Sequence, residues 1–216
     1  MIRVWWARPS EIDAALRREA PLSADERDRM SRFRQAADRD RFLSAWSLTR
    51  AVVGDLLDLP AARLTFTREC AHCGHPSHGK PRVDGDPLHF SLSHAGDRVL
   101  LAVSTVGPVG ADVEPTDRDL DDIAQNMLHP DEPPALGADL PRIWVRKEAV
   151  VKATGHGLAV ETNTFRVSGA AEPARLLAWP PDPSLPDRTT LQDVPADVGY
   201  AAAAALIRSD DAPAPE

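Results

Sequence analysis

Three short apolar runs bounded by turn residues place the strongest constraint on the fold of this chain. They are LHFSLSH, RVLLAVST and PVGADVE, which together occupy residues 88–114. Runs of this length, separated by Gly, Asp and Pro, are typical of β-strands. The sequence therefore predicts three strands in the middle of the chain. Further short strands are predicted at both ends, in IRVWWA (residues 2–7), LTFT (64–67), TFRVSG, RLLAWP and GYAAAAALI.

Helical spacing of apolar residues lies on both sides of these strands. A pattern in two parts covers Pro21 to Leu59, and its second part, from Asp40, is followed by Pro60 as a stop signal. A second helix is predicted from Arg142 to Thr154, where glycines end it. A short helix is predicted in IAQNML. The chain thus mixes helices with short strands.

Composition excludes several classes of protein. The 216 residues carry a formal net charge of -8, which argues against a general nucleic-acid binder because such binders depend on cations. No apolar run reaches the roughly 20 residues of a membrane helix. The first residues, MIRVWWARPSEID, lack the features of a signal peptide, and the two cysteines suit a reducing compartment. These features predict a soluble cytoplasmic protein.

The run from Val109 to Glu114 carries two acids. Side chains alternate along a strand, so Val109, Ala111 and Val113 would face a core while Gly110, Asp112 and Glu114 face the other way. Two carboxylates on one face suit Mg²⁺, which takes oxygen ligands and keeps places for phosphates and water. The alternative is an amphipathic strand with a solvated acidic face.

The second helix places Trp144, Glu148 and Lys152 on one face, since they follow at steps of four residues. A Glu beside a Lys suits proton transfer at a phosphate site, because the carboxylate accepts a proton and the ammonium faces negative charge. The alternative is an ordinary surface ion pair.

Four motifs in order give the chain a resemblance to a known family. They are Gly79-Lys80-Pro81, Phe90 to His94, Gly110 to Glu114, and Trp144 to Lys152. Together they resemble the motifs of the Sfp-type 4'-phosphopantetheinyl transferases. The family often has Asn and Ser where this chain has Ser91 and Ala95, which leaves the residues assigned to chemistry unchanged.

The resemblance implies an α+β fold of two similar lobes in a pseudo-twofold arrangement, with coenzyme A between them. The lobes would comprise residues 1–107 and 108–208, with a boundary near Thr105 to Val109 and a disordered tail at 209–216. It also implies transfer of the 4'-phosphopantetheine group of coenzyme A to a serine of an apo acyl or peptidyl carrier protein. Adenosine 3',5'-bisphosphate would be released, and the enzyme would be a monomer.

The resemblance further implies the site residues. Asp112, Glu114 and Glu148 would hold Mg²⁺, with Glu148 also the base for the carrier serine and Lys152 the partner of the leaving group. Coenzyme A would contact the following cationic and polar residues: Arg41, Arg50, Lys80, Ser93, His94, Lys147 and Lys152. Each of these has a structural alternative, as a solvated cation or a turn residue. The carrier, its pathway (fatty-acid, polyketide or non-ribosomal peptide synthesis) and the tolerance for acyl-coenzyme A stay open.

Two segments admit other interpretations. The Cys- and His-rich segment from Cys70 to His78 could bind zinc, although its spacing is unusual, or could be a loop with reduced thiols. Asn126 to Leu128 is either an apolar contact for the carrier or part of the core. Two other functions also remain: a non-catalytic module that binds coenzyme A or a carrier protein, and a zinc-loop regulator of nucleic acid.

Overall fold

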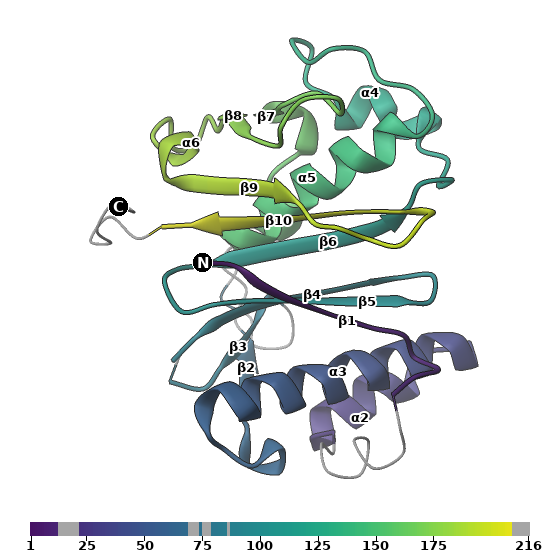
Figure 1. The fold of residues 1–216 in the computed structure, drawn as a ribbon, viewed down its shortest axis with the longest axis vertical. Helices are drawn as coiled ribbons and strands as arrows, with labels where there is room; N and C mark the ends of the chain where they lie inside the picture. The colour runs from purple at the N-terminus through teal and green to yellow at the C-terminus, as the bar shows by residue number, and fades with distance from the viewer. Residues whose placement is uncertain (13–21, 69–73, 75–78, 86, 209–216) are drawn as a thin grey trace.

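A computed structural model describes residues 1–12, 22–68, 74, 79–85 and 87–208 of the chain (Figure 1). The segment from Cys70 to His78 that could bind zinc has its Cys and His side chains outside the described residues, as does the tail at 209–216. The first half contains these elements: β1 (Arg3–Ala7), α2 (Ala24–Ser31), α3 (Ala36–Leu57), β2 (Phe66–Arg68), β3 (Pro81–Val83), β4 (His89–Ala95) and β5 (Arg98–Ser104). The second half contains β6 (Val109–Pro115), α4 (Ala124–Met127), α5 (Asp139–Thr154), β7 (Arg166–Val167), β8 (Leu176–Ala178), α6 (Leu185–Arg188), β9 (Thr189–Asp193) and β10 (Tyr200–Ile207).

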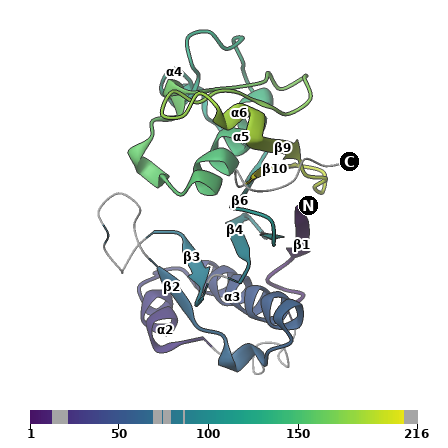
Figure 2. The same ribbon diagram turned by 90° about the vertical axis from the view of Figure 1, so that its left-hand side faces the viewer.

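Two antiparallel three-stranded sheets form the centre of the molecule. The N-terminal sheet has the strand order β1-β5-β4, and the C-terminal sheet has the order β6-β10-β9. In each sheet the first strand pairs with the last, and a long helix lies between the first strand and the final hairpin. Helix α3 covers the outer face of the N-terminal sheet, and α5 covers that of the C-terminal sheet (Figures 1 and 2).

The layered arrangement explains why β5 is apolar along its whole length. Leu101 and Val103 pack on the α3 side with Leu48, whereas Leu100 and Ala102 pack on the other side against the C-terminal sheet. A strand that is buried on both faces loses the alternation of apolar and polar residues. The central core between the sheets therefore joins the two halves of the chain.

The alanine-rich strand β10 is also buried on both faces. Ala202 and Ala204 face the central core, and Ala203 and Ala205 face α5. Small side chains let the helix and the two sheets approach closely, which a continuous run of larger residues would prevent.

The predicted elements agree with the structure in type, with shifted ends. Helix α5 begins at Asp139, three residues before the predicted start at Arg142. The helix can include Pro141 because this proline lies in the first turn, where its missing N–H is tolerated. The helix ends at Thr154 as predicted, and Gly155 follows as the C-cap with a φ of 75°. Strand β2 begins at Phe66, since a turn of 3-10 helix precedes it. Strand β9, whose sequence is TTLQD, was missed. No helix among the described residues is long and apolar enough to cross a membrane.

Candidate active site

The glycine of the VGADVE strand brings helix α5 against the acids. A Cβ added to Gly110 would lie 1.9 Å from the carbonyl oxygen of Ala149, and the backbone nitrogen of Ala153 would lie 2.4 Å away. Only a residue without a side chain permits this approach. Because Glu148 and Lys152 are next to these two alanines, the close packing of α5 on β6 delivers both to the acid strand.

Asp112 lies at the meeting point of three elements. Its Oδ1 accepts hydrogen bonds from Lys152 Nζ on α5 (2.6 Å) and from Ser93 Oγ on β4 (2.7 Å). Lys152 Nζ also donates to Ser93 Oγ at 3.1 Å. Asp112 is only 4% exposed, so the alternative of a solvated acidic face is wrong for this residue. The residues that alternate with the acids along this strand lie in the central core as predicted; they are Val109, Ala111 and Val113.

The negative charge of Asp112 affects the pKa values of Glu114 and Glu148. Burial raises the pKa of the Glu114 carboxyl, and the negative charge of Asp112 raises it further. Burial and Asp112 likewise raise the pKa of Glu148, against the opposing effect of Lys152 and Arg118. Glu114 is ion-paired with Arg118. Three carboxylates therefore share one region, and the pKa of both glutamates stays raised despite Lys152 and Arg118.

This region suits a divalent cation that is only partly coordinated by protein. Among the described residues, no group of three or more His, Cys, Asp or Glu side chains is arranged closely enough to enclose a metal. However, Asp112 Oδ2 is buried and has no hydrogen-bond partner within the part of the chain that the structure describes. A buried carboxylate oxygen without a partner is costly unless a cation or donor binds it. The donors fit Mg²⁺, which usually takes one or two carboxylates and completes its shell with phosphates and water.

The predicted helical face opens into a pocket. Trp144, Glu148 and Lys152 line the same cavity of about 530 Å³, together with Asn126, Val151, Gly157 and residues 160–163. The guanidinium carbon of Arg118 lies 5.6 Å from the centre of the Trp144 ring. The face of α5 therefore borders a space large enough for part of a ligand, which a simple surface ion pair would not require.

His94 lies among cations at the end of β4. Its side chain is exposed, yet the surrounding protein still desolvates the ring enough to lower its pKa, and the charges of Arg41 and Lys152 lower it further. Arg41 Nη1 donates to the carbonyl oxygen of Gly96 at 3.0 Å, and the same guanidinium pairs with Asp38. Asp38 opposes these cations, and the net effect still lowers the His94 pKa, so the surroundings of the ring suit an anionic ligand.

Lys80 directly precedes β3, and its side chain reaches the start of β6. Its Nζ donates to the carbonyl oxygen of Val109 at 2.5 Å, which connects the GKP motif to the start of the acid strand. Lys80 and Phe90 also line a pocket of about 440 Å³ that reaches the end of α5 at Gly155. This pocket brings together residues of both halves of the chain.

Two predicted ligand-binding residues are not brought to the acids. Arg50 is bound by both oxygens of Glu26, at 2.9 and 3.0 Å, and its side chain is 3% exposed. Lys147 has a fully buried side chain, with its Nζ 2.8 Å from Glu132 Oε1 and bonded to the carbonyl oxygen of Phe165. Buried cations need internal partners, and these two have them. The structure thus gives Arg50 and Lys147 internal ion-pair partners, Glu26 and Glu132.

Arg118 lies beside the site through its ion pair with Glu114, and no sequence pattern predicted this position. It follows Glu114 by four residues, but the intervening segment turns after Pro115, so no helical or strand period connects them. The open question about Asn126 to Leu128 is partly resolved, because Met127 is 1% exposed and belongs to the core around α5.

Two family models match this chain, one in each half. Residues 108–204 match the 4'-phosphopantetheinyl transferase superfamily, and residues 3–106 match the N-terminal region of 4'-phosphopantetheinyl transferases. A 4'-phosphopantetheinyl transferase of Bacillus subtilis is 32% identical over 69% of this chain and 72% of its own length.

Two further relatives carry the same name. The 4'-phosphopantetheinyl transferase HetI of Nostoc sp. is 33% identical over 74% of this chain and 71% of its own length. The 4'-phosphopantetheinyl transferase Sfp of Bacillus subtilis strain 168 is 26% identical over 76% and 74%, respectively. With the paired matches that span both halves, these relatives show that the chain belongs to the 4'-phosphopantetheinyl transferase superfamily.

Proposed function

We propose that this enzyme transfers the 4'-phosphopantetheine group of coenzyme A to a serine of an apo acyl or peptidyl carrier protein. The observation that carries the proposal is the environment of Asp112. Lys152 and Ser93 bind one carboxylate oxygen, and the other is buried without a partner among the residues that the structure describes. The family relationship supplies the reaction class.

Asp112, Glu114 and Glu148 would hold Mg²⁺ against the diphosphate of coenzyme A. When bound, the ion would neutralise negative charge on the transferred phosphoryl group. The unpartnered Oδ2 of Asp112 and the raised pKa values of Glu114 and Glu148 support this assignment.

Glu148 is the proposed base for the carrier serine. The serine oxygen forms a bond to the phosphorus attached to pantetheine, and the bond from that phosphorus to the adenosine 5'-phosphate breaks. Glu148 takes the serine proton, and adenosine 3',5'-bisphosphate leaves. Burial raises the pKa of the Glu148 carboxyl toward the working pH, which suits a proton acceptor.

The cations that border the acids would bind the phosphates. Lys152 lies beside Asp112 and can face the leaving phosphate, while Ser93 keeps the ammonium in place. His94 and Arg41 are proposed to contact the 3'-phosphate of the nucleotide. Lys80 is proposed to bind coenzyme A near the pocket that Lys80 and Phe90 both line. Arg50 and Lys147 are left out, because their internal ion pairs occupy them.

The nucleotide would lie between two similar lobes related by a pseudo-twofold axis. The repeated strand order of the two sheets supports this arrangement, as does the separation of the family matches between residues 106 and 108. One chain would then contain a complete site, and the enzyme would act as a monomer.

The decisive experiment uses the purified protein with coenzyme A, Mg²⁺ and a panel of apo carriers from fatty-acid, polyketide and non-ribosomal peptide synthesis. Mass spectrometry should show one added phosphopantetheine group on at least one carrier. A carrier whose serine is replaced by Ala is the control, and chelation of Mg²⁺ should stop the reaction. Binding of coenzyme A without any transfer would instead support a non-catalytic binding module.

A further inference from the structure

The hairpin that carries Ser93 and His94 ends in a two-residue tip, Gly96 and Asp97. Ala95 pairs with Arg98 across the hairpin, so the tip follows directly after the proposed nucleotide contacts. Gly96 has a φ of 53°, a conformation that suits glycine. Because His94 is only two residues before Gly96, the position of this tip affects the position of His94.

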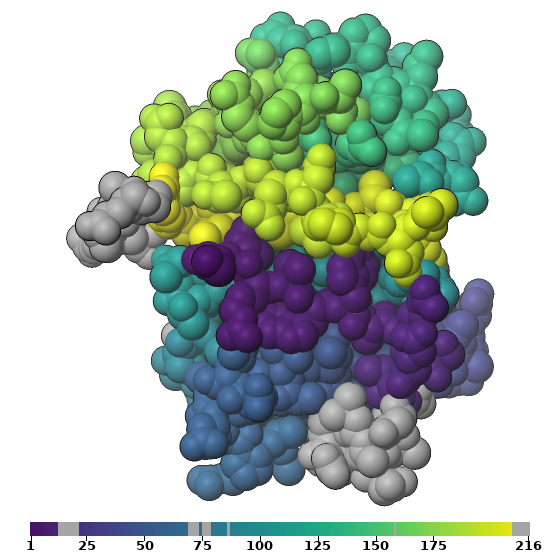
Figure 3. Space-filling model, in the orientation of Figure 1, coloured from purple at the N-terminus to yellow at the C-terminus, as the bar shows by residue number. Residues whose placement is uncertain are grey.

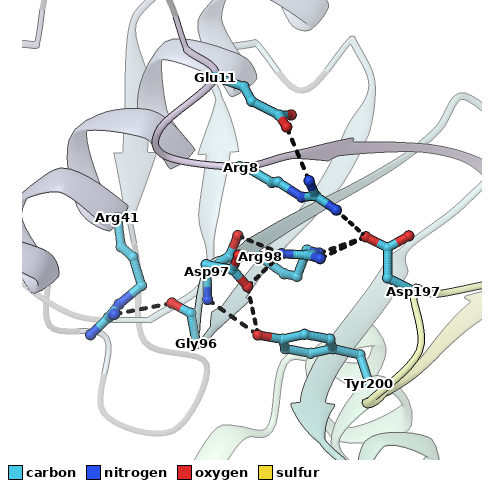
Figure 4. Close-up of polar contacts among 8 residues, drawn as sticks. All are labelled: Arg8, Glu11, Arg41, Gly96, Asp97, Arg98, Asp197 and Tyr200. Atoms are coloured by element: carbon cyan, nitrogen blue, oxygen red, sulfur yellow. Dashed lines mark hydrogen bonds and ion pairs between the residues drawn. The ribbon is translucent and has the colours of Figure 1, made fainter.

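Tyr200 holds the tip from the C-terminal half of the chain. Its hydroxyl donates to Asp97 Oδ1 at 2.7 Å and accepts from the backbone nitrogen of Asp97 at 3.3 Å (Figure 4). A Cβ added to Gly96 would lie 2.3 Å from the same hydroxyl oxygen. The tyrosine thus contacts both residues of the tip.

The other end of this connection is the acid strand. Tyr200 pairs with Pro115 and its neighbour Ala201 pairs with Glu114 in the antiparallel ladder of β10 and β6. A single side chain therefore joins the hairpin that bears Ser93 and His94 to the end of β6 that bears Glu114. On the opposite side, Arg41 of α3 binds the Gly96 carbonyl oxygen.

A second set of contacts supports the same junction. Asp197, in the loop before β10, accepts from Arg98 Nε at 2.9 Å and from Arg8 Nη2 at 2.8 Å. The Arg98 guanidinium carbon lies 4.9 Å from the centre of the Tyr200 ring. Figure 3 shows the N-terminal segment and the β10 segment meeting on this face.

On this basis, which rests on the proposed function, we propose that Tyr200 is a positioning residue for the nucleotide. Through Asp97 it sets the distance between the cationic hairpin and the acid strand, and it thereby tunes the affinity for coenzyme A. The side chains of Asp97 and Asp197 are 65% and 54% exposed, and ion pairs to exposed carboxylates add little to stability, so we expect the main effect of this cluster to be on geometry. The chemical step depends on Glu148 and Lys152, which Tyr200 does not contact among its described interactions.

The test compares three variants with a matched control. Tyr200→Phe keeps the ring under Arg98 and removes both hydroxyl bonds, and Asp97→Ala removes the partner carboxylate. Asp97→Asn keeps an acceptor oxygen for the tyrosine. The control is Asp182→Ala, which removes another exposed Asp–Arg pair, 2.6 Å from Arg188, in the C-terminal half.

Steady-state kinetics should separate binding from chemistry. We expect Tyr200→Phe and Asp97→Ala to raise KM for coenzyme A by about three- to tenfold, since both lose the hydrogen bond between the Tyr200 hydroxyl and the Asp97 carboxylate, with kcat changed less than about twofold. Combining them should add little, because each already removes the bond between the Tyr200 hydroxyl and the Asp97 carboxylate. Asp97→Asn and Asp182→Ala should keep the wild-type KM.

A spectroscopic signal can report the contact independently of turnover. Tyr200 is the only tyrosine in the chain, so labelling with 3-fluorotyrosine gives one ¹⁹F resonance. Coenzyme A should shift this resonance in the wild-type protein and shift it less in Asp97→Ala. Thermal unfolding of each variant should stay close to that of wild type.

The outcomes separate this inference from the proposed function. An inactive wild-type protein would contradict the function itself. An active wild-type protein with an unchanged KM in both Tyr200→Phe and Asp97→Ala would overturn the positioning role alone. So would a fall in kcat at constant KM, or an equal change in Asp182→Ala. Should Tyr200→Phe not fold, the contrast between Asp97→Ala and Asp97→Asn decides the question.

Discussion

Lys152 and Asp112 form a 2.6 Å ion pair that joins helix α5 to strand β6 in the centre of the proposed site. The lysine side chain is 30% exposed and the aspartate side chain 6%. The aspartate is therefore buried, and only the lysine side of the pair reaches solvent. Ser93 of β4 bonds both partners. This pair accordingly has a structural role and a place in the proposed chemistry, which experiments can separate.

Removal of the Lys152 ammonium tests that separation. Lys152→Met should lower the free energy of unfolding by about 1–3 kcal/mol, because the Asp112 carboxylate is left buried with fewer donors. Adding Asp112→Asn should recover part of this loss, since the buried charge is gone, while transfer stays absent. Chemical denaturation and the carrier mass assay measure the two effects. Recovery of transfer in the double variant would contradict the roles assigned to both residues.

Glu148→Gln tests the proposed base. The amide has nearly the same shape but cannot accept the serine proton, so kcat should fall by about 10²–10⁴-fold. The unfolding temperature should not fall, because the pKa of Glu148 is raised and its charge is not stabilising in the fold. Glu161→Gln, which alters another acid of the same pocket, is the control and should remain active. Wild-type turnover in Glu148→Gln would contradict the mechanism.

Gly110→Ala tests the close packing of α5 on β6. The added methyl group would lie 1.9 Å from the Ala149 carbonyl oxygen, so the helix must move. Such overpacking should cost about 1–3 kcal/mol of stability and reduce transfer by displacing Glu148 and Lys152. Gly169→Ala is the matched control, because its nearest neighbour would be at 3.7 Å. Equal unfolding temperatures for the two variants would argue against this packing constraint.

The protonation of His94 can be followed by NMR. Desolvation, Arg41 and Lys152 lower its pKa, so the folded protein binds a proton here less readily than the unfolded chain does. The stability contributed by this group is therefore present above the ordinary histidine range and is lost as pH falls through that range toward the folded pKa. We expect its ring signals to titrate below the ordinary pKa of about 6.5. The pH dependence of stability should weaken in His94→Gln, whereas an unchanged dependence would contradict the shift.

Bound nucleotide should reverse the shift at His94. Phosphate groups would add negative charge near the ring and raise its pKa, if His94 contacts the nucleotide as proposed. The NMR titration, repeated with saturating coenzyme A and without a carrier, measures this. An identical titration curve with and without coenzyme A would remove His94 from the proposed contacts.

Local patterns in the sequence were enough for the elements that bear the acids. The alternation of VGADVE predicted that Val109, Ala111 and Val113 would face a core, and the four-residue steps of α5 predicted a shared face for Trp144, Glu148 and Lys152. Both predictions depend only on the geometry of a strand and of a helix. Strand β9 was missed because its polar residues lie on an edge, where burial leaves a weaker pattern.

The choice among the cations could not be predicted in the same way. Arg50 forms an ion pair with Glu26, and Lys147 forms one with Glu132. These partners are distant in the sequence and come close only after folding. Lys147 precedes Glu148 directly, yet it points into the core because successive helical residues lie on different faces.

The sequence by itself thus determined which residues can act together along one strand and one helix, since those relationships follow from the local repeat of the backbone. Only the tertiary structure decided which charges meet: that Lys152 and Ser93 bind Asp112, that Arg50 and Lys147 do not reach it, and that Tyr200 holds the turn after His94. The physical reason is that ion pairs and buried hydrogen bonds form between segments brought together by the central core, and no local pattern encodes their distances.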